Sequence, residues 1–312
     1  MNLLKNTVFI LLAFMTSCVV FIKQPKYEKH DGPKKELIGN SFEYWDGSQN
    51  FVRQSIFNES DAIIICVPGL GGHAGTYNFL QKYFSERKIS TVGIDLRGFG
   101  HWVGKKGDLK NVGLHICDIN QIVDYYRDNF PDKKILLLGE SMGSSLSLWY
   151  CSFYPTKIDG LILTSLVTKK GANDIKFKSI LNLSFAFTFC STRPVPIDHE
   201  PTIYSNDPDF NKWESEIDTL KSNKISPRYL LQSNKVIKKS YGYLCIYKKP
   251  ILLLQGGKDF LSDKKSINKI LNNCRQSKIQ YKYFQDDYHS LVNDMKRNDV
   301  FETMIEWINK NY

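Results

Sequence analysis

The chain has 312 residues, of which 42% are apolar and 24% are charged. These proportions are typical of a soluble globular protein with a substantial core, and they exclude a disordered, a collagen-like and a disulfide-stapled miniature protein. The net charge of +10 comes from scattered lysine pairs, and without a basic stripe, a zinc-finger or an RNA-recognition pattern it does not favour a nucleic-acid binder.

The first 22 residues are predicted to be an export or anchor segment. Lys5 and the amino terminus precede an uncharged apolar stretch at residues 7–22, as in a bacterial export signal. Residues 15–18 (MTSC) resemble a lipobox, which makes Cys18 a candidate for lipidation. An uncleaved membrane anchor and a cleaved, secreted form are the alternatives. Each of the three places the remaining chain outside the cytoplasm or at its membrane, in the cell envelope.

A lysine-rich linker follows at residues 23–40. The lysine charge of the chain is expected to form a solvated surface, and attraction to an anionic membrane surface is the alternative that this linker supports. Residues 41–312 are predicted to form one domain, whose oligomeric state the sequence leaves open. Residues 41–60 are expected to form two strands joined at Asp46-Gly47, because an Asp-Gly pair between alternating apolar residues is a strong hairpin signal.

From residue 62 onward, short apolar strands alternate with helices. This alternation predicts an α/β fold, in which a mostly parallel sheet is covered by helices on both faces. The predicted strands are residues 62–67, 90–95, 134–139, 160–165, 251–256 and 279–284, and the predicted helices lie near 76–87, 114–129, 142–154 and 298–310.

The alternation is interrupted at about residues 167–248. This stretch holds an apolar run at 180–189 and then a segment rich in proline and charge. We predict a helical cap inserted over the carboxyl ends of the strands, where open α/β sheets bind their ligands. Phe185, Phe187 and Phe189 are expected either to line an acyl channel or touch a membrane, or simply to pack the cap on the core.

The seven cysteines contain no C-x-x-C pair, and no cluster of cysteine and histidine has the spacing of zinc ligands. We therefore predict no metal site. Cys66 falls in a predicted buried strand and Cys151 in a predicted buried helix, so both are expected to act as small core residues.

Residues 139–143 (GESMG) match the pattern G-x-S-x-G, which alone is a weak signal. The pattern gains weight here because it directly follows a predicted strand and opens a predicted helix, the setting that a nucleophile elbow requires. Ser141 is therefore the predicted nucleophile. The helix that begins behind it favours developing negative charge.

A tetrahedral oxyanion needs two aimed N–H donors. The backbone amide of Met142, directly after the nucleophile, is the first candidate. The second candidate is the amide of Leu70, in the Gly-rich loop at residues 68–73 that follows the first parallel strand. Glycines in this loop allow the backbone to turn inward.

A serine hydroxyl becomes a nucleophile only when a base takes its proton. In this kind of fold the catalytic residues follow the chain order Ser, then Asp or Glu, then His. Only His199 and His289 follow Ser141, and His199 lies in the predicted cap, so His289 is the well-placed base. Asp259 follows the strand at 251–256 and is predicted to orient His289. Asp263 is the alternative acid, whereas Asp286 and Asp287 stand too near the histidine in sequence.

Six motifs follow one another along the chain: residues 68–77 (PGLGGHAGTY), 93–100 (GIDLRGFG), 139–143, 195–213, 250–263 (PILLLQGGKDFLSD) and 287–294 (DYHSLVND). Together they resemble the monoacylglycerol lipase and lysophospholipase branch of the α/β-hydrolases, a group of serine aminopeptidase S33-type hydrolases. The chain departs from the family pattern at Pro68, Thr76, Phe99 and Trp102, which puts the binding of a substrate head group in doubt.

The resemblance implies an α/β-hydrolase fold and a serine esterase without metal or organic cofactor. We expect the substrate to be a lipid ester, a monoacylglycerol or a lysophospholipid, cleaved through an acyl-enzyme. A general carboxylesterase, a thioesterase or an acyltransferase with the same triad is the enzymatic alternative. A non-catalytic surface lipoprotein that keeps the fold is the alternative from another class.

Overall fold

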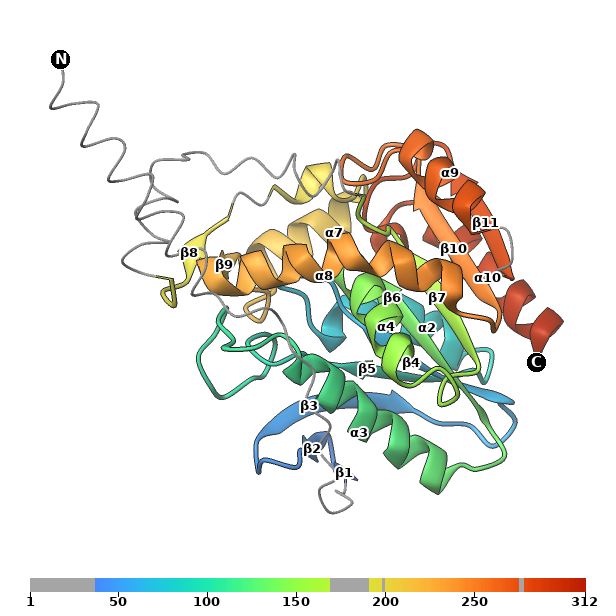
Figure 1. The fold of residues 1–312 in the computed structure, drawn as a ribbon, viewed down its shortest axis with the longest axis horizontal. Helices are drawn as coiled ribbons and strands as arrows, with labels where there is room; N and C mark the ends of the chain where they lie inside the picture. Colours follow the sequence, from blue (N-terminus) through green and yellow to red (C-terminus); the bar gives the residue numbers. More distant parts are fainter. Residues whose placement is uncertain (1–36, 169–190, 198–199, 275–277) are drawn as a thin grey trace, which may run out of the picture.

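A twisted central sheet with helices on both faces forms the body of the molecule (Figure 1). The computed structural model describes residues 37–168, 191–197, 200–274 and 278–312. Within these residues the main sheet has nine strands in the order β1-β2-β3-β5-β4-β6-β7-β10-β11. Their bounds are β1 Leu37–Ile38, β2 Ser41–Glu43, β3 Gln49–Ser55, β4 Ala62–Val67, β5 Ser90–Ile94, β6 Lys134–Glu140, β7 Gly160–Thr164, β10 Ile251–Gly256 and β11 Ile279–Phe284.

The strands from β5 to β11 in this order pair in parallel, while β1, β2 and β3 add an antiparallel edge. In the register, Glu140 of β6 stands opposite Thr164 of β7, and Thr164 stands opposite Leu254 of β10. The loops that leave these strands therefore begin at one edge of the sheet. This is the edge at which the sequence places the predicted catalytic residues.

The two faces of the sheet are covered by different helices. Ile63 and Ile65 of β4 belong to the core cluster with α3, α4 and α8, whereas Ile64 and Cys66 belong to the cluster with α2 and α10. Side chains along a strand alternate between faces, so a strand buried on both sides is apolar throughout. The helix bounds are α2 Asn78–Ser85, α3 Leu114–Asn129, α4 Met142–Phe153, α8 Pro227–Ile246, α9 Lys264–Asn273 and α10 Arg297–Asn311.

The predicted strands and helices of the alternating pattern are confirmed, as is the hairpin that turns at Asp46-Gly47. The helix expected near 76–87 is divided into a 3-10 turn, η1 (Ala74–Tyr77), and α2. The sequence analysis did not identify α9, whose ten residues include only three apolar ones. It also did not identify the two-residue strand β1.

Between β7 and β10 the described chain forms several short elements and the long helix α8. In Figure 1, α8 runs along the front of the molecule, and its residues share a core cluster with those of α4. The cap boundaries at 167–248 stay a prediction, because residues 169–190, with Phe185, Phe187 and Phe189, lie outside the described part. The short elements are β8 (Val195–Pro196), η2 (Pro201–Ile203), α7 (Pro208–Lys212), the π-turn η3 (Trp213–Ile217) and β9 (Lys224–Ile225).

A disulfide joins Cys245, at the end of α8, to Cys274, which follows α9. The sequence analysis did not foresee this bond. Cys66 and Cys151 are buried free thiols, as expected, and burial raises the pKa of both. Among the described helices, none combines the length and apolar character needed to cross a bilayer. Residues 1–36, which include Cys18, lie outside the described part.

Candidate active site

Ser141 lies on a sharp turn between β6 and α4. Its φ of 55° and ψ of −115° are unfavourable for a residue with a side chain. The turn is fixed because the Ser141 amide donates to Thr164 O at 3.0 Å, and Ser144 Oγ donates to both Gly139 O and Thr164 O. This is the nucleophile elbow predicted from the sequence.

The two glycines of the elbow are required by close backbone approaches. A Cβ on Gly143 would stand 2.0 Å from Val67 O, at the end of β4. A Cβ on Gly139 would stand 2.6 Å from the Gly143 carbonyl carbon. Since real Cβ atoms do not come this close to backbone, only glycine allows the first turn of α4 to pack on the strand ends.

His289 and Asp259 form the buried pair that the sequence predicted. Nδ1 of His289 lies 2.8 Å from Oδ1 of Asp259, and the side chains are 4% and 0% exposed. Asp259 Oδ1 also accepts from the Leu261 amide at 2.8 Å, which fixes the carboxylate. Nε2 of His289 has no hydrogen-bond partner among the described residues, so this nitrogen is available to accept a proton.

The surroundings of His289 favour its protonated form. Burial alone would lower the pKa of His289, but the Asp259 carboxylate and its hydrogen bond outweigh burial, and Glu140 adds to their effect. The pKa of His289 is therefore raised above its usual value. The alternative acid, Asp263, instead caps α9 by accepting from the Ser266 amide at 2.9 Å.

The histidine loop is tied to the nucleophile elbow by the neighbours of both residues. Ser290, directly after His289, donates from Oγ to Oε1 of Glu140 at 2.7 Å, and Glu140 directly precedes Ser141. Ser165, directly after β7, donates to the His289 carbonyl. No hydrogen bond joins Ser141 to His289 within the described residues. The structure thus brings the two loops together with the catalytic bond unformed, as apo enzymes often do.

The hydrogen bond between Glu140 and Ser290 is a feature of the candidate site that the sequence analysis missed. Glu140 is 5% exposed, and burial raises the pKa of its carboxyl group despite the Ser290 hydrogen bond and the charge of His289. A glutamate at the second position of G-x-S-x-G, at the end of a strand that is buried from Ile135 onward, is the signal that marks it. Its hydrogen-bond partner, Ser290, is 150 positions away in the sequence, so only the folded structure identifies the pair.

The predicted oxyanion donors belong to two segments that adjoin the predicted nucleophile, Ser141. Met142 begins α4, so its amide belongs to the first turn of a helix and has no intrahelical acceptor. The loop that carries Leu70 passes beside the serine, because a Cβ on Gly69 would stand 3.3 Å from Ser141 Cβ. Neither amide donates to another described residue. This arrangement fits an oxyanion hole.

The loop at residues 68–73 is joined by hydrogen bonds to the segment at residues 200–226. His73 accepts from the Gly75 amide at Nδ1, so Nε2 carries the proton and lies 2.9 Å from the Asp218 carboxylate. The Ser222 amide donates to Gly71 O at 3.1 Å. The sequence analysis gave His73 no role, because Asp218 is distant in the chain.

Aromatic rings from two segments stand beside His289. The Tyr204 ring centre lies 5.7 Å from that of His289, and the Phe260 ring centre lies 6.2 Å from it. The Tyr204 carbonyl accepts from the Ser290 amide at 2.7 Å. Phe260 is 43% exposed, so the site has an apolar rim open to solvent.

The comparisons with known proteins agree with this geometry. The family model described as serine aminopeptidase, S33, matches residues 58–296. Monoglyceride lipase of Mus musculus is 24% identical over 79% of this chain and 82% of that protein. Phospholipase YtpA of Bacillus subtilis is 25% identical over 77% of this chain and 92% of that protein.

Two solved structures are similar in fold. Monoacylglycerol lipase of Paleococcus ferrophilus has a TM-score of 0.71 at 20% identity, over 84% of this chain and 99% of that chain. A soluble variant of monoglyceride lipase from Saccharomyces cerevisiae, in complex with a substrate analog, has a TM-score of 0.74 at 18% identity, over 92% and 99%. The fold is thus the α/β-hydrolase fold. With the family model spanning the elbow, the acid and the base, the chain belongs to the serine aminopeptidase S33 family and is a serine ester hydrolase.

Proposed function

We propose that this enzyme hydrolyses carboxylic esters of lipids with one acyl chain, monoacylglycerols or lysophospholipids. The observation that carries the proposal is the bond between His289 Nδ1 and Asp259, which leaves Nε2 available beside the strained elbow of Ser141. The names of the relatives, monoglyceride lipase and phospholipase, support a lipid substrate. So does the apolar rim at Phe260.

The proposed mechanism has two halves. In the first, Ser141 Oγ bonds to the ester carbonyl carbon while its proton moves to His289 Nε2, and the Leu70 and Met142 amides stabilise the oxyanion. The carbon–oxygen bond to the alcohol then breaks, and His289 returns the proton to the leaving alcohol. In the second half, water attacks the acyl-enzyme with the same base, which releases the fatty acid and restores Ser141.

We also propose that the enzyme works at the cell envelope, held by lipidated Cys18 or by an uncleaved N-terminal anchor. The apolar stretch at residues 7–22 supports this location. So does the Cys245–Cys274 disulfide, since such bonds persist mainly in oxidising compartments. After expression in a bacterium, mass spectrometry of the membrane fraction tests the first form. A mature N-terminus at an acylated Cys18 is expected, and an intact Met1 would favour the anchor instead.

A fluorophosphonate probe tests the nucleophile. We expect the wild type to be labelled at Ser141, as read by mass spectrometry, and Ser141→Ala to be unlabelled. Ser152→Ala is the matched control, because Ser152 lies at the far end of α4 and donates only to Trp149 O. Absence of labelling in a folded wild type would contradict catalysis and favour the non-catalytic lipoprotein.

A panel of esters then tests the substrate. We expect the highest kcat/KM for monoacylglycerols or lysophospholipids with long acyl chains. Hydrolysis restricted to short, water-soluble esters would contradict the lipid part of the proposal and indicate a general carboxylesterase. Transfer of the acyl group to an added alcohol in preference to water would indicate an acyltransferase.

A further inference from the structure

The positive charge of this protein is concentrated in one part of the chain. Residues 227–282 hold thirteen of the 42 lysines and arginines but only two of the 32 aspartates and glutamates. Those two acids, Asp259 and Asp263, are used in the triad and in the cap of α9. The rest of the chain is close to neutral. The net positive charge therefore comes from the cationic segment that contains α8, α9 and β11, although lysine pairs also occur elsewhere in the chain.

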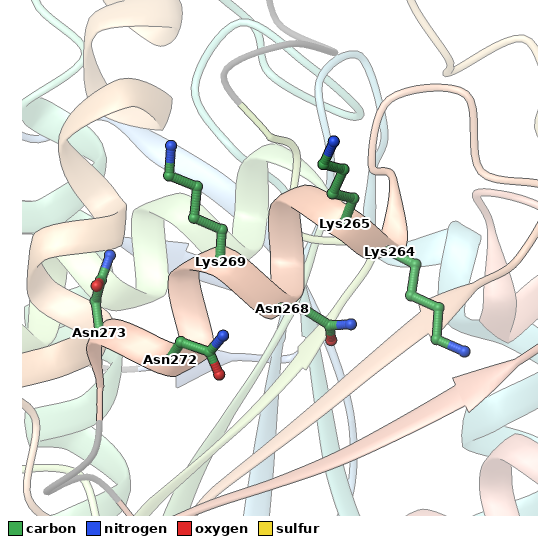
Figure 2. A pocket seen from close by; sticks show the side chains of 6 residues that line it. All are labelled: Lys264, Lys265, Asn268, Lys269, Asn272 and Asn273. Atoms are coloured by element: carbon green, nitrogen blue, oxygen red, sulfur yellow. The ribbon is translucent and has the colours of Figure 1, made fainter.

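Within this segment, the lysines stand on the outward faces of two neighbouring helices. On α8, Lys235, Lys238, Lys239 and Ile246 follow a helical spacing on the side away from the core, and Ile246 is 58% exposed. On α9, the outward side chains are lysines and asparagines that line a shallow, open hollow outside the catalytic site (Figure 2). They are Lys264, Lys265, Asn268, Lys269, Asn272 and Asn273.

The two helices present these faces as one surface, which we call the α8–α9 surface. They share the Cys245–Cys274 disulfide, whose Cα atoms are 4.4 Å apart. Both helices lack aspartate and glutamate throughout. The covalent link holds the carboxyl ends of the two helices together, so both sets of lysines contribute to the positive potential of this part of the molecule.

Three lysines of this surface, Lys239, Lys265 and Lys269, form no ion pair with a described carboxylate. Lys82 and Lys310, on other helices, are also exposed without an ion pair to a described carboxylate. The α8–α9 surface is set apart because neither of its helices carries an aspartate or a glutamate. Within the described residues the repulsion among its lysines is therefore not offset locally, which favours an anionic binding partner.

The α8–α9 surface also reaches the rim of the active site. Lys264 and Lys265 follow Phe260 by only a few residues, and Phe260 is the exposed ring beside His289. An exposed aliphatic side chain, Ile246, stands at the other end of the surface. Lysines flanked by exposed apolar side chains are the composition that binds a bilayer, because headgroups take the charges and the interface takes the apolar groups.

We propose that the α8–α9 surface docks the enzyme on a bilayer that contains anionic phospholipids, with the Phe260 rim turned toward the lipid. The docking deepens the proposed function, since it says how the site reaches a lipid substrate. It does not require catalysis, so the two are tested separately.

The test compares the full chain with two variants that lose the same charge. The first is Lys239→Gln, Lys265→Gln and Lys269→Gln on the α8–α9 surface. The control is Lys82→Gln, Lys134→Gln and Lys310→Gln, three exposed lysines on other elements. All three proteins keep residues 1–36, so any binding by the N-terminal segment is common to them. Co-sedimentation is measured with two kinds of vesicle. One contains phosphatidylcholine alone, and the other contains phosphatidylcholine with about 30% phosphatidylglycerol, an anionic lipid.

We expect the wild type to bind the anionic vesicles at least about tenfold more tightly than the neutral ones. A salt concentration of about 0.5 M should remove this difference, because it screens the charges. The α8–α9 variant is expected to lose this preference and the control to keep it. Ser141→Ala should dock like the wild type, which separates docking from the proposed function. Equal binding of both vesicles by the wild type, or an equal loss in both variants, overturns the proposal. So does competition by random double-stranded DNA at a similar affinity, which would point to a nucleic acid instead.

Discussion

The ring of His73 and the carboxylate of Asp218, which are 145 positions apart in sequence, share a buried hydrogen bond of 2.9 Å. This bond ties the loop that carries Leu70 to the 200–226 segment. The loop that carries the predicted oxyanion donor is therefore held in part by Asp218, from a segment distant in sequence.

Removing the Asp218 charge should impair catalysis through the loop. We expect Asp218→Asn to lower kcat about tenfold with a smaller change in KM, because a lost charge-assisted hydrogen bond costs about 1.5–3 kcal/mol. Asp209→Asn, an exposed acid on α7, is the control and should leave both constants unchanged. Steady-state kinetics measure the two constants, and an effect on KM alone would contradict a role in positioning the oxyanion loop.

The identity of the catalytic acid can be tested with two isosteric variants. Asp259→Asn should lower kcat about 10,000-fold, since the amide cannot hold His289 in the required tautomer. Asp263→Asn should keep kcat within about twofold, because asparagine also caps a helix well. The opposite ranking in a kinetic assay would identify Asp263 as the acid.

The pH profile should reveal the raised pKa of His289. The base must be neutral to accept the Ser141 proton, so kcat/KM should rise with pH through a pKa above the usual value of about 6.5. Glu140→Gln removes a negative charge that stabilises the imidazolium, so the rising limb should move to lower pH. Glu302→Gln, on the surface at α10, is the control. A limb that stays in place in Glu140→Gln would contradict this coupling.

Two glycine substitutions should change stability in opposite directions. Gly143→Ala places a Cβ 2.0 Å from Val67 O, so we expect the free energy of unfolding to fall by about 3 kcal/mol or more. Gly242→Ala, within α8, meets nothing within 4 Å and should raise it by about 0.5–1 kcal/mol. Urea unfolding measures both values. An unchanged free energy of unfolding in Gly143→Ala would mean that the backbone around the elbow can shift to accommodate the added methyl group.

Much of the sheet could be predicted, and a triad could be proposed, because their signals are local. The strand at 62–67 is apolar on both faces, and Ser141 stands between a buried strand and a helix with the glycines that its turn requires. Asp259 and His289 each follow a strand whose carboxyl end must reach the same edge of the sheet. The order of the motifs was therefore enough to propose the triad.

The features that were missed depend on contacts between distant segments. The helix α9 is largely polar, so its sequence resembles a solvated loop. The Cys245–Cys274 bond joins residues whose spacing carries no disulfide signature. The hydrogen bond between Glu140 and Ser290 spans 150 positions, and only the parallel register brings these residues together.

The Cys245–Cys274 disulfide closes a covalent ring that contains β10 and Asp259. A protease that cuts once inside this ring leaves both fragments joined. Such a nicked molecule would run as a single species under non-reducing electrophoresis and as two after reduction. Asp259 is thus carried on a part of the chain that stays attached to α8 and α9 even when its backbone is cut.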